Sequence, residues 1–344
     1  MKMLHLASIA TCLCTLFFNT PSSFADAASD AAACDALAAS PKDTQRPSNV
    51  SGVLFDDVNG DAAIAACTIA LNSNPENARL MFELGRAYDT ANKEQEKQFE
   101  YYKSAADKGY VVGIYNLART YERAGVHKDQ TAANKLHCKA AEASFELAYV
   151  PCGYAHDQGV GFPIDMKEAM KWYQKGADIG DATAFADLGF MYESGSAGTK
   201  DPVRAMGYYK QSAELGDILG MNNYGNYLIQ GIGAKQDIAL GMDYLKKSIE
   251  GGGDDAPVSL AEAYDRGTEI PFDATKAALN YLIALKLNGE QATRVLIEKA
   301  GAGIKPATLD AIQVQLKVEG KIFEASSGTF SPAVLAVLKD YPAK

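Results

Sequence analysis

The fold is decided by residues 184–216, which read AFADLGFMYESGSAGTKDPVRAMGYYKQSAELG. In the first half, Leu188 and Tyr192 share one face if the chain is helical, because positions three and four apart stack on an α-helix. Asp201 and Pro202 then supply a capping side chain and a proline at the first position of a second helix. The stretch therefore predicts a helical hairpin, two helices joined by a short loop.

The same hairpin pattern returns along the chain with a fixed period. An aspartate precedes the second helix in five copies at intervals of 36 residues, namely Asp129, Asp165, Asp201, Asp237 and Asp273. Each of these five residues, the cap aspartates, is predicted to accept a backbone hydrogen bond at the start of the helix that follows it. A hairpin of this size cannot bury its apolar face alone, so the copies are predicted to stack into an all-α solenoid.

The repeated residues resemble the Sel1-like repeat family, a relative of the tetratricopeptide repeat. The family pattern is roughly A-x-x-x-L-G-x-x-Y-x-x-G, a short loop, and D-x-x-x-A-x-x-W/Y-Y-x-x-A-A-x-x-G. One copy matches it at Ala184, Leu188-Gly189, Tyr192, Gly195, Asp201, Ala205, Tyr208-Tyr209, Ala213 and Gly216. The resemblance covers about residues 77–290, or about six units. It implies a right-handed α-solenoid whose groove binds partners such as envelope sensor proteins or wall-associated enzymes.

Residues 1–25 are interpreted as a secretory signal peptide. Lys2 precedes an apolar run over 3–18, and this run is shorter than the ~20 residues that span a bilayer. Pro21 breaks the run, and the small residues that follow it fit cleavage after Ala25. The alternative is a buried N-terminal helix. The first interpretation predicts a periplasmic or secreted protein whose mature chain has no membrane span.

Export predicts disulfides for the four cysteines that follow the signal peptide, because an even number of cysteines in an oxidising compartment favours disulfides. Cys34, Cys67, Cys138 and Cys152 allow three pairings. The turn predicted near residue 145 is seven residues from both Cys138 and Cys152. These two then lie at equal depth on facing antiparallel helices, where Cα atoms reach the ~5–6 Å that a disulfide needs. The favoured pairs are Cys138–Cys152 and Cys34–Cys67.

The two flanks do not follow the period. Residues 26–76 are expected to form an N-terminal cap segment that is loop-rich over 26–56 and has a first helix over 59–73. Residues 291–344 are expected to hold a terminal helix over 291–300, a linker and a small helical segment.

The C-terminal segment resembles the small helical peptidoglycan-binding module. The matching residues are Leu309, Leu316, Gly320, Gly328, Phe330 and Pro332, and Ser331 replaces the usual glycine of that family. The resemblance implies a tether to peptidoglycan. The alternative is an apolar cap that closes the solenoid.

The charge of the chain excludes one class of partner. Its 344 residues include 33 basic and 43 acidic side chains, a net charge of −10. An acidic surface without a basic patch repels a phosphate backbone, so no nucleic-acid partner is predicted. The same surface favours a protein partner that carries a basic patch.

No residue pattern predicts catalysis, a metal site or a cofactor site. His137 and His156 take positions that are aromatic in sister copies, so both are expected in or near the core. The glycine pairs at 159–161 and 231–233 do not follow a strand and lack the full spacing of a phosphate loop. The sequence favours a non-catalytic periplasmic interaction scaffold or regulator. The alternatives are a peptidoglycan-associated binding protein and, third, a hydrolase of wall peptides or β-lactams.

Overall fold

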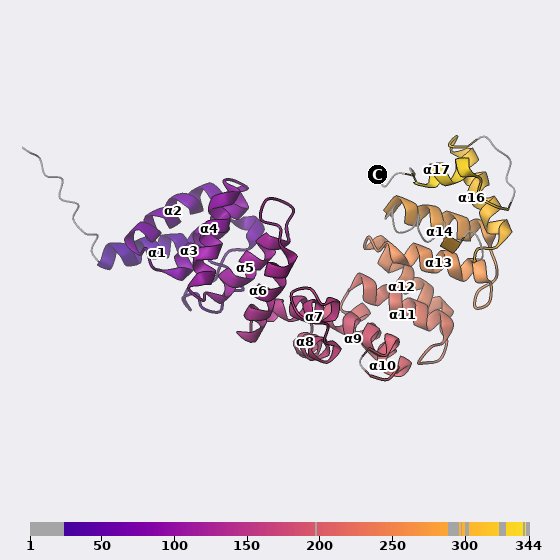
Figure 1. Ribbon diagram of the computed structural model, residues 1–344, viewed down its shortest axis with the longest axis horizontal. Helices are drawn as coiled ribbons and strands as arrows, with labels where there is room; N and C mark the ends of the chain where they lie inside the picture. The colour runs from indigo at the N-terminus through magenta and orange to yellow at the C-terminus, as the bar shows by residue number, and fades with distance from the viewer. Residues whose placement is uncertain are drawn as a thin grey trace, which may run out of the picture. The chain divides into compact units, whose positions relative to one another are not determined.

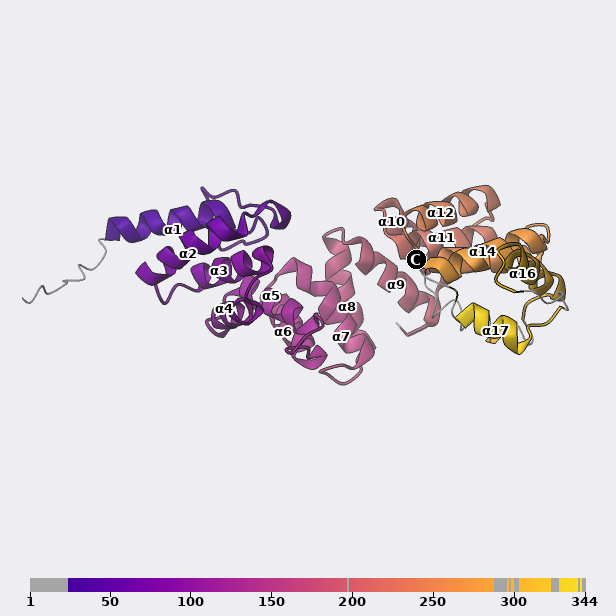
Figure 2. The same ribbon diagram turned by 90° about the horizontal axis from the view of Figure 1, so that it is seen from above.

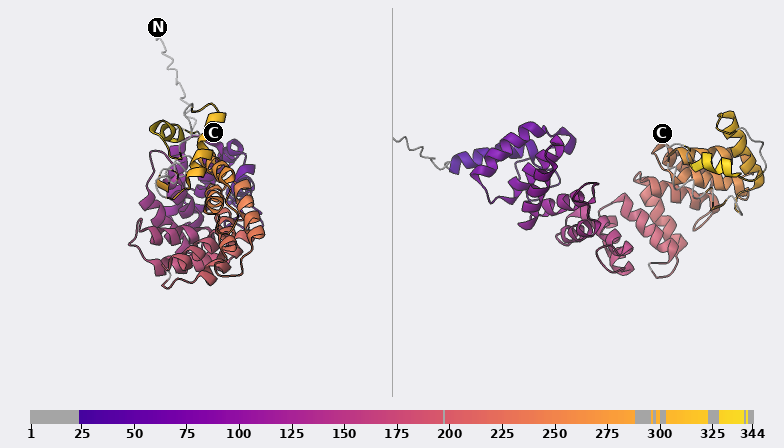
Figure 3. Two further views of the ribbon diagram at one scale, coloured as in Figure 1. Left: turned by 90° about the vertical axis from the view of Figure 1, so that its right-hand side faces the viewer. Right: turned by 45° about the horizontal axis from the view of Figure 1, so that its top comes forward.

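The computed structural model describes residues 24–196, 198–287, 296, 298–299, 303–322, 328–339 and 341. Helices are the only regular secondary structure in these residues (Figure 1, Figure 3), which confirms the predicted all-α fold. The signal peptide predicted over 1–25 and the helix predicted over 291–300 lie almost entirely outside them. None of the described helices is long and apolar enough to cross a bilayer.

The chain divides into two compact units, residues 1–120 and 121–344. In the first unit, α1 lies along α2, and both contact α3 (Figure 2). The core between them contains Cys34, Cys67, Leu80 and Leu84. The helices are α1 (Phe24–Ala38), α2 (Gly60–Ser73), α3 (Ala78–Ala91), α4 (Gln95–Asp107) and α5 (Val111–Glu122), with a 3-10 turn η1 at Phe55–Asp57. The last two residues of α5 belong to the second unit.

The expectation of a loop-rich segment over 26–56 is wrong for its first part, which forms α1. Eight of the 15 residues of α1 are alanine, the residue with the highest helix propensity. Propensity rather than an amphipathic pattern forms this helix, so a reading based on apolar periodicity misses it. The following residues 39–54 do form a loop, and α2 covers the helix expected over 59–73.

The loop between α1 and α2 is held by one buried side chain, that of Arg86 in α3. Its guanidinium donates hydrogen bonds to the carbonyl oxygens of Ala38 at 2.8 Å, Ala39 at 3.0 Å and Val53 at 2.6 Å. These acceptors come from both ends of the loop, so Arg86 joins the two ends to α3.

A cluster of buried charged side chains lies in the same unit. Asp43 accepts a hydrogen bond from the hydroxyl of Tyr110, and Arg79 forms an ion pair with Asp35. Glu83 is fully buried, with its Oε1 3.4 Å from Nη1 of Arg79. Burial, reinforced by the charge of Asp43, raises the pKa of Glu83 to about 8. Protonation of Glu83 therefore removes a buried negative charge at neutral pH.

This raised pKa predicts a pH-dependent stability. The unfolded chain releases the Glu83 proton near its ordinary pKa of 4.5, whereas the folded chain retains it to about 8. The protonated Glu83 side chain stabilises the folded chain fully below pH 4.5. The free energy of unfolding then falls as the pH rises from 4.5 through 8, by at most about 1.4 kcal/mol per pH unit. Urea unfolding of Glu83→Gln should lack this decline. The exposed Glu96→Gln should retain it, and parallel profiles for all three proteins would contradict the assignment.

The second unit begins at the end of α5 and continues the hairpins. Figure 1 shows its helices following one another as antiparallel pairs. They are α6 (Gln130–Glu142), α7 (Tyr149–Gln158), α8 (Met166–Asp178), α9 (Ala182–Ser194), α10 (Pro202–Glu214), α11 (Ile218–Gln230), α12 (Ile238–Glu250), α13 (Asp255–Arg266), α14 (Ala274–Leu287), α16 (Pro306–Val318) and α17 (Pro332–Lys339), with a 3-10 turn η2 at Glu146–Ala148.

The cap aspartates each make two kinds of hydrogen bond. Their Oδ1 atoms accept backbone N–H groups of the first turn of α6, α8, α10, α12 and α14 at 2.9–3.0 Å. Their own backbone N–H groups donate at 2.9–3.2 Å to a carbonyl oxygen near the end of the preceding helix, on Tyr121, His156, Tyr192, Leu228 and Tyr264. Each aspartate therefore joins the two helices of its hairpin as well as capping the second.

Small residues allow the helices of a hairpin to approach closely. A Cβ atom on Gly189 would lie 2.6 Å from the ring of Tyr209. Between α11 and α12 the backbones themselves are in contact, because a Cβ on Gly241 would lie 2.7 Å from the carbonyl oxygen of Gly225. Sister copies carry alanine in the slot of Gly241, including the fully buried Ala205. The repeated small residues are thus explained by helix packing.

The C-terminal helices share a core with the last repeats. Leu309, Ile312 and Leu316 of α16, and Val334 and Leu338 of α17, pack in one cluster with α13 and α14. In Figure 3, α16 and α17 are drawn in yellow, and α16 contacts α14. The segment that resembles the peptidoglycan-binding module is therefore packed onto the repeat array rather than forming a core of its own.

Candidate functional site

The first helices of the hairpins in the second unit expose a row of side chains that we call the first-helix face. Residues 36 apart take equivalent places on α7, α9, α11 and α13, so the row is regular. Tyr154 is 51% exposed and Phe190 is 55% exposed. Helix α11 contacts both α9 and α13. The face consists of Tyr154, Asp157, Asp187, Phe190, Glu193, Asn223, Asn226, Ser259 and Glu262.

The first-helix face lacks positive charge over three helices. The described helices α7, α9 and α11 contain no lysine or arginine, whereas they carry Asp157, Asp187 and Glu193. The basic side chains lie on the second helices instead. These are Lys167, Lys171 and Lys175 on α8, Arg204 and Lys210 on α10, and Lys246 and Lys247 on α12. The second helices also carry the acidic residues Glu168, Asp178, Glu214, Asp243 and Glu250, so both signs of charge lie there, whereas α7 and α9 carry carboxylates without lysine or arginine.

Asp187 is the most perturbed carboxyl group of this face. It is half-buried, and burial raises its pKa to about 7. The charges of Asp157, Asp217 and Asp181 raise it further. Among the described residues, the Asp187 side chain has no hydrogen bond or ion pair. A positively charged neighbour would stabilise the ionised form of a half-buried carboxyl group that is surrounded by other carboxylates.

Further along the face, polar side chains are joined to one another. The hydroxyl of Tyr209 donates a 2.5 Å hydrogen bond to Glu193. Asn226 donates to the Ser259 hydroxyl at 2.9 Å, and Ser259 donates to Asn222 at 3.0 Å. These bonds link α9 with α10 and α11 with α13.

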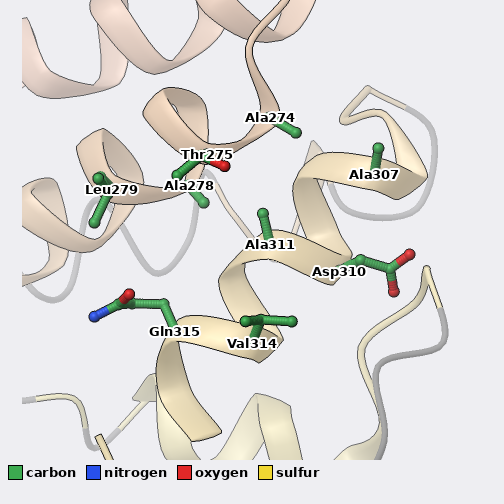
Figure 4. Close-up of a pocket in the computed structure, with 9 residues that line it drawn as sticks. All are labelled: Ala274, Thr275, Ala278, Leu279, Ala307, Asp310, Ala311, Val314 and Gln315. Carbon is green, nitrogen blue, oxygen red and sulfur yellow. The ribbon is translucent and has the colours of Figure 1, made fainter. Parts of the chain in front are cut away.

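A second candidate site is a groove between α14 and α16. Its volume is about 350 Å³, and it is lined by Ala274, Thr275, Ala278, Leu279, Ala307, Asp310, Ala311, Val314 and Gln315. Figure 4 shows Ala278 and Ala311 pointing into the space between the helices. The carboxylate of Asp310 accepts the backbone N–H of Gly328 at 2.6 Å, which ties the turn before α17 to α16. The groove is therefore small, largely apolar and open.

The structure joins the predicted cysteine pairs as disulfides. Cys138 and Cys152 have Cα atoms 4.7 Å apart, and Cys34 and Cys67 have Cα atoms 4.6 Å apart. His156 and Glu83 lie near one pair each, in arrangements that resemble metal sites. Cysteine binds a metal ion as a thiolate, and a disulfide sulfur is not a thiolate. Neither group therefore fits a metal ion in the oxidised chain.

The two histidines that could suggest chemistry have structural partners. His137 is buried, and its Nε2 lies 2.8 Å from a carboxylate oxygen of Glu122. His156 is half-buried and stacks on Phe162 with ring centroids 4.5 Å apart. Both positions agree with the expectation of a core or half-buried role.

The first-helix face was not predicted from the sequence. Core and capping positions stand out because packing restricts them to small or apolar residues, whereas exposed positions vary freely. One signal was present, since Tyr154 and Phe190 are 36 residues apart and the helices around them contain no lysine or arginine. A comparison of charge between alternate helices would have found the face.

A family model described as Sel1 repeat matches the chain over residues 78–110, 111–145, 142–181, 184–217 and 218–253. These five matches cover the hairpins from α3–α4 to α11–α12. The α13–α14 hairpin, which the sequence resemblance also included, lies beyond them and still carries the fifth cap aspartate, Asp273. Among curated proteins, none matches the chain.

Two solved structures are similar over most of the chain. A Sel1 repeat protein from Oxalobacter formigenes is 29% identical with a TM-score of 0.57, and the alignment covers 65% of this chain and 92% of that one. A protective antigen present in uropathogenic Escherichia coli strains, which displays an SLR fold, is 23% identical with a TM-score of 0.58. That alignment covers 76% of this chain and 56% of the antigen. The second likeness concerns the fold alone.

Proposed function

Because the chain belongs to the Sel1 repeat family, we propose that it is a non-catalytic interaction scaffold or regulator whose protein partner docks on the first-helix face. The observation that carries the proposal is the pair of exposed rings of Tyr154 and Phe190, which take equivalent places on α7 and α9 of the first-helix face. Exposed aromatic rings anchor protein interfaces, and a face held rigid by stacked helices loses little entropy on binding.

We further propose that the protein acts in the periplasm or is secreted. The apolar run that begins the chain and the disulfides Cys34–Cys67 and Cys138–Cys152 support this location, because disulfides persist in oxidising compartments. Its partners would then be envelope or periplasmic proteins.

Site-specific photo-crosslinking in living cells tests the docking face. A photoreactive amino acid at Tyr154 or Phe190 should yield one discrete adduct with a partner protein. The same amino acid at Val203 in the first turn of α10, or at Leu215 just after its end, should not yield that adduct, although both residues are exposed. An identical adduct from all four positions, or no adduct from Tyr154 and Phe190, would argue against docking on this face.

A second candidate function is association with peptidoglycan through the C-terminal helices. The groove between α14 and α16 favours it, because its alanine floor leaves room for a small ligand group. Because α16 and α17 share the core of α13 and α14, the full mature chain is the proper reagent. It should sediment with purified sacculi, and Ala311→Trp, which fills the groove, should abolish this, whereas Val203→Trp should not. Absence of the wild-type chain from the pellet would dismiss the tether.

A further inference from the structure

We propose that the partner segment that docks on the first-helix face is an extended basic peptide, whose lysine or arginine side chains lie between the rings of Tyr154 and Phe190 and the carboxylates of Asp157 and Asp187. This inference rests on the proposed function, since it names the partner of the same face. Three observations support it, namely the carboxylates on helices without lysine or arginine, the exposed rings, and the Asp187 carboxyl group that has no hydrogen-bond partner among the described residues.

Charge complementarity selects the chemistry of the partner. Over α7, α9 and α11 the face presents three carboxylates and no lysine or arginine, and the cap residues Asp181 and Asp217 lie at the starts of α9 and α11. An acidic segment would meet like charges, whereas a basic segment would be steered to the face and held in register. On the second helices Lys171, Lys210 and Lys247 form ion pairs with acidic residues of the same helix, so those helices present no row of unpaired carboxylates to a basic segment.

The exposed rings favour the same partner. Tyr154 and Phe190 occupy equivalent places on α7 and α9, one repeat apart, and about half of each side chain is open to solvent. The face of an aromatic ring attracts a cation through its quadrupole, more strongly when the cation is partly desolvated. Each ring has a carboxylate three residues away on the same helix, Asp157 beside Tyr154 and Asp187 beside Phe190. One cation can therefore contact a ring and a carboxylate together.

Asp187 gives the binding a characteristic pH dependence. The groups that face it are Asp157 from α7, the caps Asp181 and Asp217, Tyr173 from α8 and Tyr209 from α10. None of them is a cation. A docked lysine or arginine would favour the ionised carboxylate, whose pKa in the free protein is about 7. Binding should therefore strengthen from pH 6 to pH 8, by up to about tenfold as the ionised fraction rises.

The experiment measures fluorescence anisotropy of a labelled octalysine peptide with the full mature chain. An octa-acetyllysine peptide of the same length serves as the uncharged probe. Octalysine should bind at pH 8 and the acetylated peptide should not. The double variant Asp157→Asn/Asp187→Asn should weaken octalysine binding by about tenfold or more, and Asp187→Asn alone should remove the dependence between pH 6 and pH 8.

The matched control is Asp178→Asn/Asp243→Asn, which changes the net charge equally at exposed positions on α8 and α12. Its affinity should stay within about twofold of the wild-type chain. An equal loss in both double variants would mean attraction by the whole acidic protein, and would overturn the proposal. Failure of octalysine to bind the wild-type chain, or unchanged affinity in Tyr154→Ala/Phe190→Ala, would overturn it as well.

The crosslinking experiment separates this inference from the proposed function. If the wild-type adduct at Phe190 persists in Asp157→Asn/Asp187→Asn, docking on the face stands and the basic partner is wrong. If no adduct forms at Tyr154 or Phe190 in the wild-type chain, the proposed function itself fails, whatever octalysine does. Far-UV circular dichroism and urea midpoints confirm that each variant folds.

Discussion

Arg86→Met should lower the free energy of unfolding of the first unit by about 3 kcal/mol or more. The substitution keeps most of the side-chain volume but removes every donor to the carbonyl oxygens of Ala38, Ala39 and Val53. These acceptors lie at both ends of one loop, so their loss should release the loop as well as lower the free energy of unfolding. Urea unfolding measures the first effect, and limited proteolysis within residues 39–54 measures the second.

The control for this prediction is Arg119→Met, which replaces an exposed arginine on α5 of the same unit. Its effect should stay within about 0.5 kcal/mol, as is usual for exposed positions. If Arg86→Met and Arg119→Met have equal midpoints and equal proteolysis rates, Arg86 does not hold the loop. Faster cleavage without a change in midpoint would mean that the loop contributes nothing to the stability of α1–α3.

Gly241→Val should cost about 3 kcal/mol in the second unit. A Cβ atom at Gly241 would lie 2.7 Å from the carbonyl oxygen of Gly225 and 2.7 Å from Cγ1 of Ile229. Valine adds two further carbons at this crossing, and the backbone of α11 cannot rotate away as a side chain can. Helices α11 and α12 must therefore separate, which a lower thermal midpoint by circular dichroism would report.

Gly207→Val provides a matched control, because Gly207 is also inside a second helix but has no atom within 4 Å of a built Cβ. Glycine and valine both disfavour a helix interior, so this exchange should change stability by less than about 0.5 kcal/mol. A similar destabilisation in both variants would trace the loss to helix propensity instead of to the α11–α12 contact. Gly241→Ala should fall between the two, because sister copies accept alanine there.

The periodic features could be predicted because each repeats the same physical constraint. The spacing of the cap aspartates located the second helices, since every hairpin needs an acceptor at the same place. The seven-residue distance of Cys138 and Cys152 from one turn likewise selected a pairing that the structure contains. Repetition let several weak local signals support one another, so the middle of the chain was read more accurately than its flanks.

The features that were missed lack that repetition. Helix α1 depends on alanine content, and the role of Arg86 depends on carbonyl groups that its own sequence neighbourhood does not reveal. The first-helix face was missed for a different reason. Packing leaves exposed positions unrestricted, so Tyr154 and Phe190 carry no local mark of function. Only the absence of lysine and arginine from three alternate helices indicated that these positions differ from an ordinary solvated surface.

The double role of the cap aspartates makes each hairpin tolerant of added sequence. The N–H of Asp129 reaches the carbonyl of Tyr121, eight residues earlier, whereas the corresponding bond of Asp201 to Tyr192 spans nine. The loop thus already varies in length between two fixed ends. Residues 123–126 are exposed, with open space around Gly125, and lengthening such a loop costs little entropy. An epitope tag or fluorescent reporter inserted there would leave the helical register intact and give a handle for following the protein in cells.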